Sequence, residues 1–262
     1  MELKNTPQGY FIYAVMGLYA VAFVLAVLRR RTAAWVVYTA GFLVALAAYL
    51  YRWQDAGHVP MQSLFEVFLT LGVLILPISV FCKRFLGVNS LAGDLLLGVV
   101  VLFPAGFIFK AEPQRLPPAL QCWLFAPHVA VYMLSYLLMA KAAFQAGLQL
   151  LAPPPLPARV KYEQATYGMV RLGFPLLTLG LILGSWWGKL AWGDWWGWDP
   201  KELWSLASWL VYVFYLHWRY MHGQRYARFN SALAIAGLAA IVITLLWVNL
   251  SRLFPGIHNY AT

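Results

Sequence analysis

The chain has 262 residues, of which 62% are hydrophobic and only 11% are charged, and its mean hydropathy is +0.67. A soluble domain of this length would carry about twice that share of charged residues, so the composition excludes an ordinary soluble protein and favours an integral membrane protein. The basic residues behind the net charge of +10 are spread along the chain and form no basic face, which argues against nucleic-acid binding. They are better explained by the orientation of the protein in its membrane and by contact with anionic lipid.

Eight segments are apolar and close to the ~20 residues that a helix needs to cross a bilayer. In chain order they are residues 10–28, 34–51, 63–82, 91–109, 124–150, 169–187, 203–219 and 231–250. Their apolar runs are continuous and do not alternate, which favours helices over strands. We therefore predict an all-α polytopic membrane protein in which residues 1–262 form a single membrane-integral domain. The stretch APPPLP, residues 152–157, is predicted to be a short stiff linker.

Lysine and arginine predict the orientation of these helices. One set of helix ends carries Arg29, Arg30, Arg31, Lys83, Arg84, Lys141, Arg159, Lys161, Arg171, Arg219, Arg225 and Arg228. The opposite set carries only Lys4, Arg52, Lys110, Arg115, Lys189, Lys201 and Arg252. Because the side richer in these residues faces the cytoplasm, both termini and the loop between the sixth and seventh spans are predicted to be extracytoplasmic.

That loop contains the stretch WGDWWGWDPKE, residues 192–202, with four tryptophans within seven residues. Isolated tryptophans elsewhere fit the aromatic belt of a membrane interface. The density here, and the embedded Asp194 and Asp199, favour instead a surface that binds a flat apolar ligand. Asp199 also has a structural interpretation as the N-cap of the next helix, with Pro200 at the first helical position and Glu202 three residues after the cap.

The five histidines differ in their predicted depth. His128 and His258 lie on the outer side with the tryptophans, and two imidazoles from separate helices are a common way to ligate haem iron. His217 lies near the inner end of the seventh span, about 22 Å of helix from Glu202, so it cannot ligate the same iron atom. His58 is predicted to be structural, and His222 to be solvated. For haem propionates the outer side offers Lys189, Lys201, Arg52 and Arg252.

Several stretches resemble a known family. WGKLAWGDWWGWDPKELWSLASWLVYVFYLH, residues 187–217, resembles the tryptophan-rich WWD signature of haem-handling proteins. PALQCWLFAPHVAVYMLSY, GHVPMQSLFE and FPGIHNYAT resemble the corresponding parts of the CcsA/ResC branch, the haem-handling subunit of the System II cytochrome c synthase. Two departures are mild: Gly188 stands where alanine is expected, and Trp195 where tyrosine is frequent.

The resemblance implies about eight helices and a WWD loop, residues 186–202, that holds haem b (iron protoporphyrin IX) between two outer histidines. It implies that reduced CxxCH thiols of apocytochrome c meet the haem there, and that His217 pairs with a histidine of a separate CcsB/ResB-type subunit. The residues so assigned to haem are His128, His258, His217, Trp187, Trp192, Trp195, Trp196, Trp198 and Asp199. No catalytic side chain is predicted, because the reacting thiols belong to the substrate.

The expected role is thus the haem-binding subunit of a lyase-type holocytochrome c synthase in a bacterial cytoplasmic membrane, with a thylakoid membrane as the alternative. A System I haem chaperone of the CcmC type would have about six spans. A membrane b-type cytochrome that passes electrons to quinone would pair histidines within its own helices, and no inner pair exists here. A solute channel or transporter would carry no haem.

Overall fold

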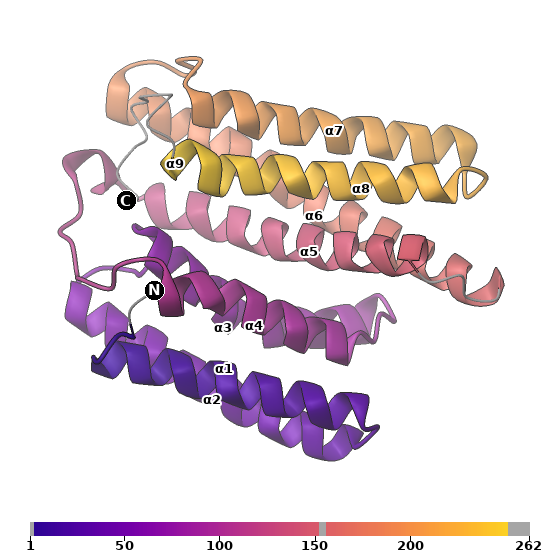
Figure 1. Ribbon diagram of the computed structural model, residues 1–262. Helices are drawn as coiled ribbons and strands as arrows, with labels where there is room; N and C mark the ends of the chain where they lie inside the picture. The colour runs from indigo at the N-terminus through magenta and orange to yellow at the C-terminus, as the bar shows by residue number, and fades with distance from the viewer. Residues whose placement is uncertain (1–2, 152–155, 251–262) are drawn as a thin grey trace. The chain divides into compact units, whose positions relative to one another are not determined.

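A computed structural model describes residues 3–151 and 156–250, without the side chains of residues 156–160. In these residues all regular secondary structure is helical (Figure 1). The chain divides between Gln121 and Cys122 into two compact units, each with its own set of packed helices. The assignment of the whole chain to a single functional domain stays a prediction.

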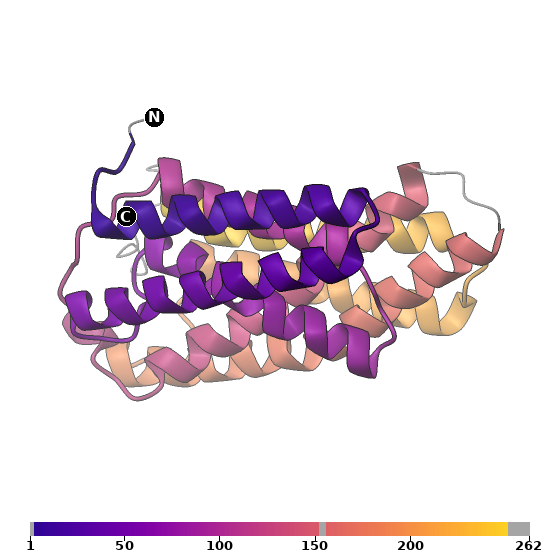
Figure 2. The same cartoon turned by 90° about the horizontal axis from the view of Figure 1, so that it is seen from below.

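The first unit contains four long helices. They are α1 (Pro7–Val27), α2 (Arg31–Ala56), α3 (Leu64–Phe85) and α4 (Leu91–Phe107), followed by the short 3-10 helix η1 (Pro118–Leu120). The first two run side by side, as both views show (Figure 1, Figure 2), and α1 also packs on α4 while α3 packs on α2 and α4. Short connections therefore join neighbouring helices that run in opposite directions.

Tyr19 lies at the centre of this unit and is fully buried. A Cβ atom added at Gly41 or at Gly98 would lie 2.7 Å from its ring, so these two glycines let α2 and α4 approach α1 closely. The hydroxyl of Tyr19 donates to the carbonyl oxygen of Gly72 in α3 at 3.3 Å. One aromatic side chain thus contacts all three neighbouring helices, as small residues permit in membrane bundles.

The second unit contains α5 (Phe125–Leu151), α6 (Leu156–Trp192), α7 (Pro200–His222) and α8 (Ala227–Val242). The last of these continues as the π-helix η2 (Ile243–Trp247) and the short α9 (Val248–Leu250). Helix α5 packs along α6 and on α8, and α7 packs on α8 and α6. A π-helical turn is rare and is often found near functional sites; here it lies just before the segment that contains His258.

A buried polar cluster joins three helices of this unit. Glu163 of α6 accepts hydrogen bonds from the guanidinium of Arg219 in α7, with Nη2 to Oε2 at 3.0 Å, and from the side-chain amide of Asn230 in α8 at 3.1 Å. Glu163 and Asn230 are each 1% exposed. Because a buried charge is tolerated only when it is paired, this cluster restrains how the three helices pack.

Six of the described helices are long and apolar enough to cross a membrane, judged by length and composition. Helix α4 is apolar but has 17 residues, and α7 has 23 residues with a more polar sequence. The predicted all-α polytopic membrane architecture is therefore confirmed, and every predicted span coincides with a helix. That all eight cross the membrane stays a prediction.

Some predicted boundaries were wrong. Helix α6 begins at Leu156 and has 37 residues, so the predicted linker at residues 152–157 already includes its first turn, where Pro157 is tolerated. The span predicted for this helix covered only residues 169–187, because the prediction followed the apolar run and the first part of α6 is more polar. The loop predicted at residues 186–202 is also shorter, since α6 continues to Trp192 and α7 starts at Pro200.

Candidate functional site

Residues 193–199, here called the tryptophan loop, connect α6 to α7. The loop begins with Gly193 at a φ of +91° and contains Trp198 at a φ of +57°. The left-handed region suits glycine but costs free energy for a bulky aromatic residue. Trp198 is also 66% exposed, so packing around its side chain does not explain this conformation. Strain of this kind is frequent at binding sites.

A capping box fixes the end of the loop. The carboxylate of Asp199 accepts from the backbone N–H of Lys201 at 2.8 Å, and Glu202 accepts from the backbone N–H groups of Asp199 at 3.0 Å and of Gly197 at 2.8 Å. The predicted N-cap of α7 is thus confirmed. Asp199 is only 7% exposed, which gives its carboxylate a structural task beside the predicted contact with haem.

Side chains of α6 fix the beginning of the loop. Ser185 donates from its hydroxyl to the carbonyl oxygen of Trp195 at 2.7 Å, and the ammonium of Lys189 donates to the carbonyl oxygen of Gly193. A Cβ atom at Gly188 would lie 3.3 Å from the carbonyl oxygen of Asp194. An alanine at position 188 would therefore require the loop to shift by a few tenths of an ångström. Lys189, predicted as a partner of propionates, already binds the loop backbone.

Ring contacts connect His128 to the tryptophans. The imidazole of His128 lies 5.8 Å from the ring of Trp187, and Trp187 lies 4.9 Å from Trp192, measured between centroids. Trp187 is 4% exposed, so it forms the buried link between α5 and the end of α6. Three residues that the sequence assigned to one site are therefore brought together.

The remaining loop tryptophans are oriented differently. Trp195 is 57% exposed, and Trp196 contacts Trp198 at 6.0 Å with an interplanar angle of 84°. The buried indole N–H of Trp196 finds no hydrogen-bond partner among the described residues. Because the rings meet edge to face, they do not form the single flat platform that the sequence suggested. Exposed indole faces beside an unused donor still fit a large aromatic ligand that carries acceptors.

A carbonyl contact fixes the orientation of the His128 ring. Its Nδ1 atom lies 2.9 Å from the carbonyl oxygen of Gly180 in α6. A carbonyl oxygen only accepts, so Nδ1 carries a hydrogen in this contact. Histidines that ligate metals usually donate a ring N–H to such an acceptor, which fixes the ring orientation. The contact of His128 therefore fits its predicted role in haem binding.

The sequence analysis did not identify the glycines of α6 that leave room for the imidazole of His128. A Cβ atom at Gly184 would lie 2.6 Å from Cε1 of His128, and one at Gly180 would lie 2.8 Å from the ring of Tyr132. Gly180, Gly184 and Gly188 recur every four residues and so lie on one face of α6. This small-residue spacing is the sequence signal that could have predicted close packing against α5.

The other candidate ligands lie apart from this cluster or outside the described residues. His258 and Arg252 are outside the described residues. His217 is exposed on α7, and its Nδ1 atom lies 2.8 Å from the carbonyl oxygen of Val213. Its exposure fits a ligand that faces another polypeptide.

The rings of His222 and His58 both contact neighbouring residues of the protein. The prediction of a solvated His222 was wrong, because its half-buried ring stacks on Trp218 with centroids 4.0 Å apart and planes at 23°. The sequence placed it in a charged loop but gave no sign of this contact. His58 lies with Nδ1 3.0 Å from the carbonyl oxygen of Val59 and Nε2 3.0 Å from that of Gln114, which fits the predicted structural role.

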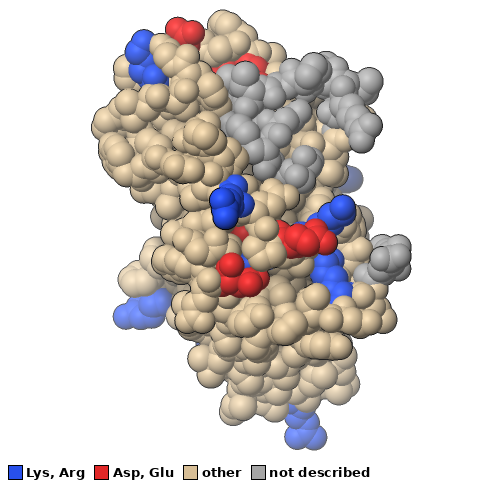
Figure 3. Space-filling view, turned by 90° about the vertical axis from the view of Figure 1, so that its left-hand side faces the viewer, with Lys and Arg blue, Asp and Glu red and all other residues tan. Residues whose placement is uncertain are grey.

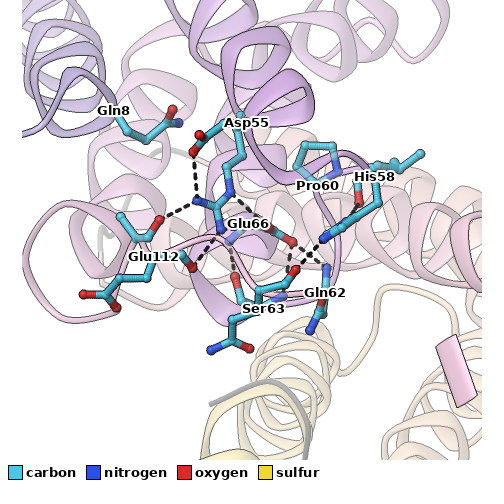
Figure 4. A network of polar contacts seen from close by, with 12 residues as sticks. Gln8, Asp55, His58, Pro60, Gln62, Ser63, Glu66 and Glu112 are labelled. Carbon is cyan, nitrogen blue, oxygen red and sulfur yellow. Dashed lines mark hydrogen bonds and ion pairs between the residues drawn. The ribbon is translucent and has the colours of Figure 1, made fainter. Parts of the chain in front are cut away.

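Arg52 was predicted to be available for a propionate, and that prediction was wrong. Its fully buried guanidinium forms an ion pair with Glu66, with Nε 2.9 Å from Oε1 (Figure 4). It also donates to the backbone carbonyl oxygens of Ala111 and Glu112. The sequence indicated the depth of Arg52 in the membrane but not its partner, because the carboxylate comes from another helix.

Together, a bundle of apolar helices and a histidine next to a tryptophan loop define a polytopic membrane protein with an aromatic site at one end of its second unit. The chain belongs to the family described as cytochrome C assembly protein, which matches residues 33–255. Among its relatives is the cytochrome c biogenesis protein CcsA of Synechococcus sp. (strain RCC307). The two are 33% identical over 256 residues, which cover 83% of this chain and 81% of that protein.

A protein of Chlamydomonas reinhardtii with the same name is 31% identical over 234 residues, covering 83% of this chain and 65% of the relative. The resemblance to CcsA-type proteins is thus confirmed. Among solved structures, the cytochrome c heme lyase CcmF matches with a TM-score of 0.69 and 19% identity. The match covers 94% of this chain but 48% of CcmF, so this chain spans about half the length of that protein and shares its fold over that part.

Proposed function

We propose that this chain holds haem at the extracytoplasmic face of a membrane and presents it for thioether attachment to the CxxCH motif of apocytochrome c. The observation that carries the proposal is the contact series from His128 through Trp187 to Trp192. This series connects the imidazole of His128 to Trp192, the last residue of α6 before the tryptophan loop. Membership in the cytochrome c assembly family and the CcsA relatives support the same role.

In this proposal His128 and His258 would hold the iron of haem b. The exposed rings of Trp195 and Trp198 supply apolar contact area for the porphyrin. Bound haem supplies the two vinyl groups to which the cysteine thiols add. The protein contributes positioning, because a reaction between fixed partners loses much of its entropic barrier. With both histidines bound to the iron, the protein would keep oxygen away from it.

His217 has a separate role in this proposal. It is exposed on α7 and lies fifteen residues, or roughly 22 Å of helix, beyond Glu202 in the first turn of α7. An exposed ionisable residue within a membrane is a functional candidate. We assign it to a second haem position, shared with a histidine of a CcsB/ResB-type subunit, through which haem crosses from the cytoplasmic side. The complex would then be a System II cytochrome c synthase in a bacterial cytoplasmic or a thylakoid membrane.

A pyridine haemochrome spectrum of the complex, purified after coexpression with its partner subunit, tests the proposal. We expect haem b in the wild-type complex, and a lower haem content together with lost cytochrome c maturation in His128→Ala. The matched control is His222→Ala, which removes an imidazole from the same unit but outside the site. If the wild-type complex contains no haem, or if His128→Ala keeps full haem content and maturation, the proposal fails.

A further inference from the structure

The first unit contains a cavity of about 690 Å³ that is separate from the tryptophan loop. The N-terminal segment before α1, the end of α2 and the residues that follow α4 line it. Its apolar wall includes Tyr51, Phe107 and Phe109. Cavities of 300–1,000 Å³ with apolar walls and a few polar groups are typical of small-molecule sites.

Gln8 lines this cavity and carries an unsatisfied acceptor. Its side chain is 4% exposed, and its Nε2 atom donates to the carbonyl oxygen of Ala48 at 3.2 Å. The Oε1 atom of Gln8 is buried and has no partner among the described residues. Exchanging the two amide atoms would not help, because Oε1 would then face the carbonyl oxygen of Ala48. A buried acceptor without a donor costs roughly 1–3 kcal/mol, so this position favours a ligand that donates a hydrogen.

Charges of both signs also line the cavity. The carboxylates are those of Asp55 and Glu112, and the ammonium groups are those of Lys4 and Lys110. Acidic and basic side chains lie close together at this end of the molecule (Figure 3). Burial lowers the pKa of Lys4, and the nearby Glu112 partly offsets this effect. Two charges of each sign favour a ligand that carries both a cation and an anion.

The walls of the cavity are fixed before any ligand binds. Lys4 donates from Nζ to the carbonyl oxygen of Gly106 at 3.1 Å, and its backbone N–H donates to the hydroxyl of Tyr13 at 2.8 Å. The buried guanidinium of Arg52 also binds the carbonyl oxygens of Ala111 and Glu112, two residues of the lining (Figure 4). Such a preorganised site loses little conformational entropy on binding.

We propose that this cavity binds the phosphoethanolamine group of a phospholipid or of a soluble phosphodiester. The primary ammonium donates to Oε1 of Gln8 and to the carboxylates of Asp55 and Glu112, and the phosphate accepts from Lys4 and Lys110. A choline group has no N–H and cannot satisfy Gln8. A phosphoglycerol group carries no cation to pair with the two carboxylates of the lining. The cavity lies at the predicted extracytoplasmic helix ends, where we expect lipid headgroups.

The test uses the full chain, delipidated in detergent and reconstituted into nanodiscs of equal parts phosphatidylethanolamine and phosphatidylcholine. Native mass spectrometry then counts the lipids that remain bound. We expect about a tenfold preference for phosphatidylethanolamine, which corresponds to one charge-assisted hydrogen bond. Displacement by soluble glycerophosphoethanolamine would show that the headgroup suffices, and no displacement would show that the acyl chains contribute; both outcomes support the site.

Two variants and two controls complete the test. Gln8→Leu and Glu112→Ala should each remove most of the preference, because each variant removes an acceptor of the ammonium group, whereas Gln114→Leu and Arg115→Gln, on exposed residues beyond the cavity lining, should keep it. Glu112 is exposed, so its variant decides the question if Gln8→Leu does not fold. Equal retention of both lipids by the wild type, or a wild-type preference in Glu112→Ala, would overturn the proposal. Displacement by a lysine-rich peptide without any lipid preference would also overturn it, in favour of a protein partner.

Discussion

The Nδ1 atom of His128 lies 2.9 Å from the carbonyl oxygen of Gly180, and a Cβ atom at Gly184 would lie 2.6 Å from Cε1 of the same imidazole. The orientation of His128 therefore depends on two glycines of the neighbouring helix α6. One of them accepts the ring hydrogen, and the other leaves room for the ring.

Gly184→Ala is expected to displace the imidazole of His128 while α6 stays helical. The complex should then contain less haem, or haem with a shifted Soret band, because the ring no longer points in the ligating direction. Gly168→Ala is the matched control: it lies in the same helix, and its new Cβ atom would meet nothing within 4 Å. That control should stabilise α6 by up to about 1 kcal/mol. Identical spectra for both variants would contradict the role given to Gly184.

Trp198→Gly should change stability and haem retention in opposite directions. Glycine adopts a φ of +57° without strain, so the variant should be more stable by about 1 kcal/mol in thermal unfolding. The loss of the exposed indole should nevertheless lower the haem content of the complex. Trp195→Gly removes a similar indole from a residue without a positive φ and should bring no gain in stability. A fall in stability for Trp198→Gly would show that its indole packs in the unliganded protein.

Glu202→Ala should loosen the tryptophan loop. The carboxylate accepts from the backbone N–H groups of Asp199 and Gly197, and the loss of such capping bonds costs about 1–2 kcal/mol. Limited proteolysis should then cleave residues 193–199 faster, and less haem should remain bound. Glu202→Gln keeps an acceptor at the same place and should resemble the wild type. Equal proteolysis of Glu202→Ala and the wild type would argue against this function of the capping box.

Glu66→Ala should be strongly destabilising because it leaves the buried guanidinium of Arg52 without its carboxylate. The loss of one partner of a buried ion pair costs about 3–5 kcal/mol, which thermal unfolding in detergent would detect. Asp55→Asn is the control, since Asp55 lies 3.9 Å from Arg52 with a side chain that is 44% exposed. Its effect should stay below about 1 kcal/mol. A small effect of Glu66→Ala would mean that water reaches Arg52.

His217→Ala should leave the thermal stability of the isolated chain unchanged, because the side chain is exposed on α7. In the complex with the partner subunit, the same variant should lower the amount of haem per complex if His217 ligates iron there. His222→Ala should keep that haem. A full haem content in His217→Ala would assign the exposed imidazole to another task.

The sequence predicted those features that depend on neighbours along the chain. Apolar runs located the helices, and the spacing from Asp199 to Glu202 correctly predicted the capping box of α7. Contacts between side chains of different helices were harder to predict from the sequence. The partner of Arg52 is fourteen residues away on α3, and the surroundings of His128 come from glycines on α6 that carry no chemical signal of their own. The polar first turns of α6 were missed because hydropathy identifies only the part of a helix that lies in the bilayer.

Arg52 binds residues 111 and 112 through their main-chain oxygens. Hydrogen bonds to main-chain oxygens impose no demand on which amino acids occupy this connection, provided that its backbone path is kept. The side chains between α4 and α5 can therefore vary in evolution while Arg52 and Glu66 are retained. The surface that this connection forms can then change its preference for lipids or protein partners without loss of the fold.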